Sequence, residues 1–148
     1  MNFYPVAKKI LFQLDPEEAH HFIIYNLQLA GNFPALVKFL AGNKVINSSL
    51  HRHLLGLDFP NPVGLAAGLD KNGDVIDEMS MMGFGFVEIG TITPRAQPGN
   101  DRPRLFRLVK DRALINRMGF NNVGAEVAAQ KLKRRKTEII VGVNIGKN

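Results

Sequence analysis

The chain has 148 residues, no cysteine and a formal net charge of +6 at pH 7. This length is typical of one domain with its own core, and the lack of cysteine excludes disulfides and thiolate metal sites. The four histidines show no ligand spacing, so we expect no metal site. The positive charge suggests an anionic partner, which a phosphate, a lipid or a nucleic acid would satisfy equally well.

Residues 1–45 predict short helices separated by turn signals. Asp15 is a good N-cap, and the residue after it is a proline, which fits the first helical position. The expected helices span about Tyr4–Leu14, 16–30 and Pro34–Ala41.

The second of these helices carries large apolar residues on nearly every side: Phe22, Ile23, Ile24, Tyr25, Leu27 and Leu29. A surface helix normally shows one apolar stripe. Two explanations of this apolar character stay open. The helix could be buried against the rest of the protein, or it could contact a membrane or form an apolar tunnel. No apolar run is long enough to cross a bilayer, and the N-terminus lacks the pattern of a signal peptide.

After residue 46 the pattern changes to alternating strands and helices. Strands are expected at Val63–Ala67, Phe86–Ile89 and Ile139–Val143. Helices are expected at about 75–82 and 124–133, and hairpins around Gly56 and at 105–115. This alternation predicts a parallel sheet with right-handed crossovers.

Polar or small residues follow each of the three strands. Gly68 and Lys71 follow the first, Thr91 the second and Asn144 the third. Any one of them could be a cap or a turn residue. Parallel α/β folds build their ligand sites at these carboxyl ends, so three such strands in a row favour a site.

Two further stretches have competing interpretations. Residues 114–122 contain three asparagines, which suit a ligand with imide and carboxylate groups, although Asn122 would also serve as a helix N-cap. The basic run 131–136 fits a solvated helix C-terminus that complements the helix dipole. It could also contact nucleic acid, but no aromatic platform accompanies it.

Several stretches together resemble the dihydroorotate dehydrogenase family: 61–71, 88–94, 97–100, 104–107, 115–122 and 144–148. The apolar helical N-terminus is similar to the quinone-dependent, membrane-associated class of that family. The resemblance covers essentially the whole chain. It implies an α/β fold, namely the N-terminal part of a (β/α)₈ TIM barrel preceded by a small helical extension.

The resemblance also implies a division of the chain. Residues 1–45 would form a helical extension for membrane contact and quinone access, and 46–148 the first three β/α units. The family's serine base and its later flavin-phosphate loops have no counterpart, because Ser48, Ser49 and Ser80 stand in other contexts. We therefore expect an incomplete, inactive barrel in which Val63, Leu65, Val87 and Ile89 lack inward partners.

The implied activity is oxidation of (S)-dihydroorotate to orotate in de novo pyrimidine (UMP) biosynthesis, with FMN as cofactor and a quinone as electron acceptor. By the same likeness, the residues that would contact FMN are Ala67, Gly68, Leu69, Asp70, Lys71, Thr91 and Asn144. Those that would hold the substrate are Lys71, Asn116, Arg117, Met118, Gly119 and Phe120. His20 and Arg107 would stand at the quinone entrance.

The likeness further implies a bacterial-type peripheral protein on the cytoplasmic side of the cytoplasmic membrane. Two other functions stay open. One is a flavin-free remnant or regulatory module that keeps the fold without the chemistry. The other is a nucleic-acid-binding module that uses the basic run, although we expect no nucleic-acid partner.

Overall fold

The computed structural model describes residues 4–42 and 47–148. Three helices open the chain: α1 (Tyr4–Leu11), α2 (Pro16–Gly31) and α3 (Pro34–Ala41). A short 3₁₀ turn at Ser48–Leu50 follows. The expected boundary between residues 45 and 46 lies outside the described residues, so the division into two parts stays a prediction.

The start of α2 is capped as the sequence predicts. The Asp15 carboxylate accepts hydrogen bonds from the backbone N–H groups of Glu17 and Glu18, at 2.8 and 3.3 Å. These bonds satisfy two of the donors that a helix start leaves open. Helix α1 ends at Leu11, earlier than the expected Leu14, because the chain turns there toward the Asp15 cap.

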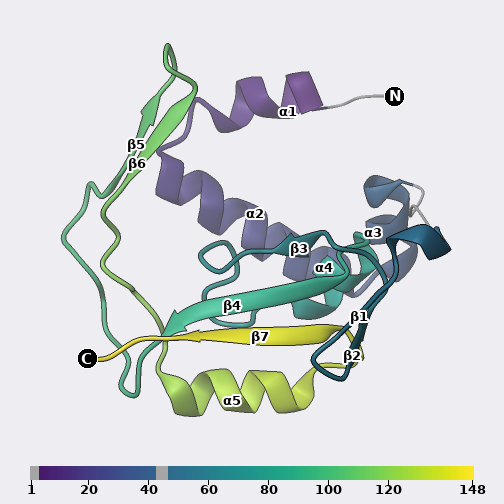
Figure 1. The fold of residues 1–148 in the computed structure, drawn as a ribbon. Helices are drawn as coiled ribbons and strands as arrows, with labels where there is room; N and C mark the ends of the chain where they lie inside the picture. The colour runs from purple at the N-terminus through teal and green to yellow at the C-terminus, as the bar shows by residue number, and fades with distance from the viewer. Residues whose placement is uncertain (1–3, 43–46) are drawn as a thin grey trace.

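Both expected hairpins are present. Strand β1 (Arg52–Leu54) pairs antiparallel with β2 (Leu57–Phe59), and the turn between them contains Gly56. Strand β5 (Leu105–Leu108) pairs antiparallel with β6 (Ala113–Asn116). In Figure 1 this second hairpin reaches up beside α1, away from the parallel sheet.

The parallel sheet has the strand order β3-β4-β7 and carries the site. It consists of β3 (Gly64–Leu65), β4 (Phe86–Ile92) and β7 (Ile140–Ile145), and both pairings are parallel. Helix α4 (Ile76–Met81) connects β3 to β4. Helix α5 (Ala125–Arg134) precedes β7 in the chain and lies alongside it (Figure 1). The chain is therefore a partial β/α barrel behind a helical segment, as predicted.

One face of this sheet forms the core with the helices. Val87 and Ile89 of β4 are fully buried against Val75, Ile76 and Met79. Partly buried residues from α2 and α5 complete the cluster, among them Ile24, Leu27 and Leu132. The expectation that Val87 and Ile89 lack partners is therefore wrong, because their side chains point to the helices.

Two elements are shorter in the structure than the sequence predicts. The first strand covers only Gly64–Leu65 and not the expected Val63–Ala67, and Val63 before it is 60% exposed. The reason is that β3 pairs only with β4 among the described strands. The expected helix at 75–82 ends one residue early, since α4 ends at Met81, and Met82 after it is 41% exposed.

Burial explains only part of the apolar character of α2. Ile24 and Leu27 pack on the core, whereas Phe22, Tyr25 and Leu29 are exposed. In the described part of the chain, none of the helices has the length and apolarity needed to cross a bilayer.

Candidate functional site

A cavity of about 400 Å³ opens at the carboxyl ends of the three parallel strands. It brings together residues that are far apart in the sequence: Ala67, Gly68, Lys71, Gly90, Thr91, Asn100, Asn116, Arg117, Met118, Gly119, Phe120 and Asn144. Most of the predicted flavin and substrate residues are therefore neighbours around one hollow.

Two glycines shape this cavity. Gly68 has a φ of +110°, and a Cβ added there would meet no atom within 4 Å, so the backbone is open to close approach by a ligand. Gly119 has a φ of +73°, and a Cβ there would come within 2.8 Å of Asn100. A side chain at Gly119 would push residues 116–120 away from Asn100, which lies beside them in the same wall.

The charged groups on the cavity wall are cationic. Lys71 and Arg117 line the cavity, and no carboxylate stands among its described lining residues. Burial lowers the pKa of Lys71 below its ordinary value, and the positive charge of Arg104 lowers this pKa further, while Glu17 offsets part of the effect. This arrangement favours an anionic ligand.

A hydrogen-bonded chain fixes the wall formed by β4 and β7. The Thr91 hydroxyl donates to Oδ1 of Asn144 at 2.7 Å, and Nδ2 of Asn144 donates to Glu88 at 3.2 Å. Both predicted residues lie within strands, because β4 and β7 extend further than expected. No local sequence pattern distinguishes Glu88, whose carboxylate accepts from the Asn144 amide and orients it.

The opposite wall consists of residues 116–120 and Asn100. The Asn116 side chain accepts a hydrogen bond from the Met118 N–H at 2.9 Å. The Asn100 amide donates to the carbonyl of Arg117 at 2.7 Å, and the Asn100 N–H to that of Met118 at 3.0 Å. Asn100 belongs to a stretch that carried the resemblance, yet no role was predicted for it.

Two predicted flavin residues do not line this cavity. Asp70 is buried, and its carboxylate accepts hydrogen bonds from the N–H groups of Asp74 and Val75 at 2.7 and 2.9 Å. Burial raises its pKa, and these hydrogen bonds oppose that rise. Asp70 thus shapes the turn before α4, and Leu69 lines the neighbouring cavity described next.

A second cavity, of about 380 Å³, lies beside the first. Both predicted quinone-access residues, His20 and Arg107, line it. The two cavities share four wall residues: Ala67, Gly68, Asn116 and Met118. These four residues therefore separate the polar cavity at the strand ends from the second cavity, which lies beneath the helical segment.

The two access residues are held differently. The Arg107 guanidinium donates to the carbonyls of Leu14 and Leu11, at 2.6 and 3.3 Å, and lies 4.7 Å from the centroid of the Phe12 ring. It thereby satisfies carbonyls at the end of α1. Burial, and then the charges of His21 and Lys71, lower the pKa of His20, which favours its neutral form.

Asn122 does not cap α5 as expected, because Gly124 occupies the N-cap position. The Asn122 side chain instead accepts from the N–H groups of Gly124 and Thr93, at 2.8 and 3.3 Å. It also donates to the Thr93 hydroxyl at 2.9 Å. Asn122 thus joins the loops that follow β4 and β6.

The basic run contacts two acidic residues, one just before α4 and one within it. Lys131 forms an ion pair with Asp74, and the Asp77 carboxylate accepts hydrogen bonds from the N–H groups of Lys136 and Thr137. These contacts fit a helix end packed against α4.

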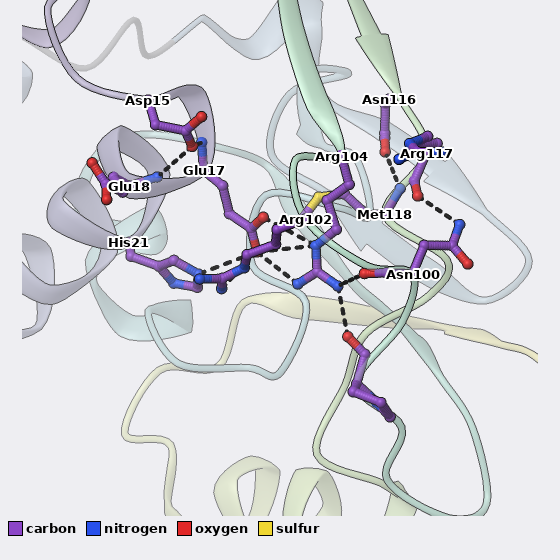
Figure 2. A network of polar contacts seen from close by, with 11 residues as sticks. Asp15, Glu17, Glu18, His21, Asn100, Arg102, Arg104, Asn116, Arg117 and Met118 are labelled. Atoms are coloured by element: carbon purple, nitrogen blue, oxygen red, sulfur yellow. Dashed lines mark hydrogen bonds and ion pairs between the residues drawn. The ribbon is translucent and has the colours of Figure 1, made fainter.

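A buried ion pair that the sequence did not predict lies behind the cavity. The Glu17 carboxylate meets the guanidinium groups of Arg102 and Arg104, with shortest distances of 2.9 and 2.6 Å (Figure 2). Glu17 is 3% exposed, and hydrogen bonds from Arg104 lower its pKa to about 2. An acidic residue in a first helical turn is common, so nothing in the sequence distinguished Glu17 from Glu18.

Parallel strands crossed by helices, with a cationic cavity at their carboxyl ends, define the chain as part of a β/α-barrel protein with a small-molecule site. Comparison with known proteins identifies the family. Residues 49–148 match the dihydroorotate dehydrogenase family, and the chain belongs to it.

Similar proteins carry the name "Dihydroorotate dehydrogenase (quinone)". One from Shewanella sp. (strain ANA-3) is 56% identical over 146 residues, or 99% of this chain and 42% of the relative. One from Shewanella denitrificans is 52% identical over 145 residues, with coverages of 98% and 42%. The chain therefore spans about 42% of the length of these relatives and corresponds to their N-terminal portion.

The fold also matches a solved structure, that of DHODH from Eimeria tenella in complex with ferulenol. The TM-score is 0.74 at 42% sequence identity, over 90% of this chain and 36% of that one. The ligand-free form of the Eimeria protein matches with a TM-score of 0.71.

Proposed function

We propose that this chain is the N-terminal portion of a quinone-dependent dihydroorotate dehydrogenase, which oxidises dihydroorotate to orotate in pyrimidine biosynthesis and reduces a quinone. The observation that carries this proposal is the wall shared by the two cavities. A reaction that passes electrons from a polar substrate to an apolar acceptor needs two such sites within reach of one cofactor. The names of the relatives support the same activity.

The lining of the first cavity supports a site for the flavin ring of an FMN cofactor. The open backbone at Gly68 admits a flat ring, and the amide and hydroxyl groups of Asn144 and Thr91 suit its polar edge. Ala67, Gly68, Lys71, Thr91 and Asn144 would hold it, and Leu69 and Asp70 would support the turn beside it. Bound FMN would supply the acceptor for the hydride of dihydroorotate.

The substrate would bind between the flavin site and residues 116–120. Dihydroorotate carries a carboxylate and an imide, which match a cation and side-chain amides. The Lys71 ammonium would attract the carboxylate, and Asn100 and Asn116 would contact the imide. Because their strands and loops are hydrogen-bonded to one another, these groups are held in place before the substrate arrives.

The second cavity would admit the quinone. Helices α1–α3, called here the helical extension, expose large apolar residues, including Phe22, Tyr25, Leu36, Phe39 and Leu40. Such a surface suits the interface of a bilayer, where quinones reside. We propose peripheral binding on the cytoplasmic side of the membrane, with His20 and Arg107 at the entrance.

The test is dihydroorotate-dependent quinone reduction by a barrel that contains this chain as its N-terminal portion, called here the full-length barrel. Replacing Lys71 with alanine should retain the fold but lower turnover about 100-fold or more, because a preorganised charge is lost. The control is Lys110→Ala, in the exposed turn between β5 and β6. Near-normal turnover of Lys71→Ala would contradict its role, and an unaltered barrel without flavin or activity would favour the remnant hypothesis.

A further inference from the structure

The ion pair between Glu17 and Arg104 joins the helical extension to the segment before β5, two parts that lie far apart in the sequence. Glu17 stands in the first turn of α2, and Arg104 directly precedes β5. Figure 2 shows the guanidinium of Arg104 between the Glu17 carboxylate on one side and the loop of Asn100 on the other. Both side chains are almost completely buried.

Arg104 uses all three of its nitrogens. Nε donates to the Glu17 carboxylate at 3.0 Å, and Nη2 donates to it at 2.6 Å. Nη1 donates to the backbone carbonyls of Pro98 and Asn100, at 2.7 and 2.8 Å. One planar group therefore fixes the loop and the helix in a single relative orientation.

The loop that Arg104 fixes is a wall of the cavity. Asn100, which lines the cavity, bonds to the backbone of Arg117 and Met118, and the N–H of Arg117 donates to the carbonyl of Arg104 at 2.9 Å. Arg104 thus stands behind both lining segments without lining the cavity itself. A shift of the guanidinium would move Asn100 and residues 117–119 together.

Glu17 is what keeps the guanidinium in this place. A buried cation without a counter-ion is unfavourable, so Arg104 without Glu17 would be drawn toward water and away from the two carbonyls. The Glu17 charge also offsets the repulsion that Arg104 exerts on Lys71. Loss of Glu17 would therefore disturb both the shape and the charge of the cavity.

We infer that Glu17 and Arg104 are positioning residues, through which helix α2 holds Asn100 and residues 117–119 in the geometry that binds the substrate. In naming dihydroorotate and orotate as ligands, this inference rests on the proposed function. It assigns to the helical extension a role in the substrate site that is separate from quinone access.

The test uses Glu17→Gln in the full-length barrel, with Glu18→Gln as the control. Glu18 stands in the same helical turn, but it is exposed and its side chain points away from Arg104 in Figure 2. Orotate affinity is read from the change in flavin absorbance, and KM is measured separately for dihydroorotate and for the quinone.

The inference predicts that Glu17→Gln weakens orotate binding and raises KM for dihydroorotate by about tenfold or more, because small displacements of binding groups are costly. Flavin content should stay within about twofold. KM for the quinone should rise less than KM for dihydroorotate because, among Asn100 and residues 117–119, only Met118 also lines the second cavity. Glu18→Gln should behave like the unaltered protein. The double variant Glu17→Gln/Arg104→Gln should show less than the product of the two single effects, since both changes break one interaction.

A lower melting temperature of Glu17→Gln with unchanged orotate affinity would overturn the inference, because that is the result of a purely structural ion pair. If Glu17→Gln does not retain flavin, Arg104→Lys decides, since it keeps the charge but loses the planar fork. If neither variant retains flavin, the pair is a folding requirement and the positioning role is refuted. An unaltered barrel that binds neither flavin nor orotate would refute the proposed function instead.

Discussion

The helical extension and the parallel sheet use apolar residues in opposite ways. On the sheet side, Val87 and Ile89 are fully buried against α4. In α1–α3, the buried residues are Glu17, Ala19 and Val37, while large side chains such as Tyr25 and Phe39 are exposed. Apolar composition alone therefore does not distinguish a core from a contact surface.

The different burial of apolar residues in the two regions indicates that they are stabilised in different ways. The sheet is stabilised mainly by packing on α4. The extension is attached through Ile24 and Leu27 at the edge of this core, through the buried Glu17, and through the hydrogen bonds of Arg107 to the carbonyls of Leu11 and Leu14. An exposed apolar surface of this extent is typical of a region that binds something else. We therefore expect substitutions in the two regions to affect different measurements.

The largest difference in stability is expected between Ile89→Ala and Phe39→Ala in the full-length barrel. Ile89 is fully buried, so its truncation should lower the free energy of unfolding by about 2–5 kcal/mol. Phe39 is 77% exposed, so its truncation should change that free energy by less than about 0.5 kcal/mol. Urea denaturation checks both values, and equal losses would show that the extension is part of the core.

For membrane association, we expect the exposed residues of the extension to matter more than the buried residues of the sheet. Replacing Phe22, Tyr25 and Phe39 together with serine should weaken binding of the full-length barrel to anionic vesicles by about tenfold, because apolar area no longer enters the interface. The control is Leu55→Ser, at the tip of the β1–β2 hairpin, where Leu55 is 91% exposed. If vesicle binding is unchanged by the triple substitution, or falls equally in the control, the extension is not the membrane surface.

A smaller change in stability is expected at acid pH. It arises at Glu17, where the extension is attached to the barrel. The pKa of Glu17 is lowered from 4.5 to about 2, so its stabilising effect is fully present above pH 4.5 and is lost as the pH falls toward 2. Glu17→Gln should remove this part of the acid dependence and shift the melting temperature by about 2–4 °C per kcal/mol lost. Glu18→Gln should leave the acid dependence intact, and an identical loss in both variants would contradict the assignment.

The sequence was sufficient for the features that local chemistry determines. The Asp15 cap, the hairpin at Gly56 and the order of strands and helices follow from capping, turn and periodicity rules. The convergence of Lys71, Thr91 and Asn144 on one cavity follows from the rule that parallel strands end at the same edge.

Tertiary contacts determined the rest. Whether Val87 points to the helices or away from them depends on which side of the sheet the helices cover, and alternation along the strand does not reveal that side. Asp70 looks like a ligand residue in sequence, yet nearby N–H groups engage its carboxylate. Glu17 and Arg104 lie 87 positions apart, and no local pattern connects them.

We propose that the cavity at the strand ends holds FMN and the substrate side by side. A crystal structure of the full-length barrel with FMN and orotate tests it most directly. We expect the flavin to contact Gly68, Thr91 and Asn144, and orotate to lie between Lys71 and Asn116. A flavin bound elsewhere, or an orotate without contact to Lys71 and residues 116–120, would contradict it.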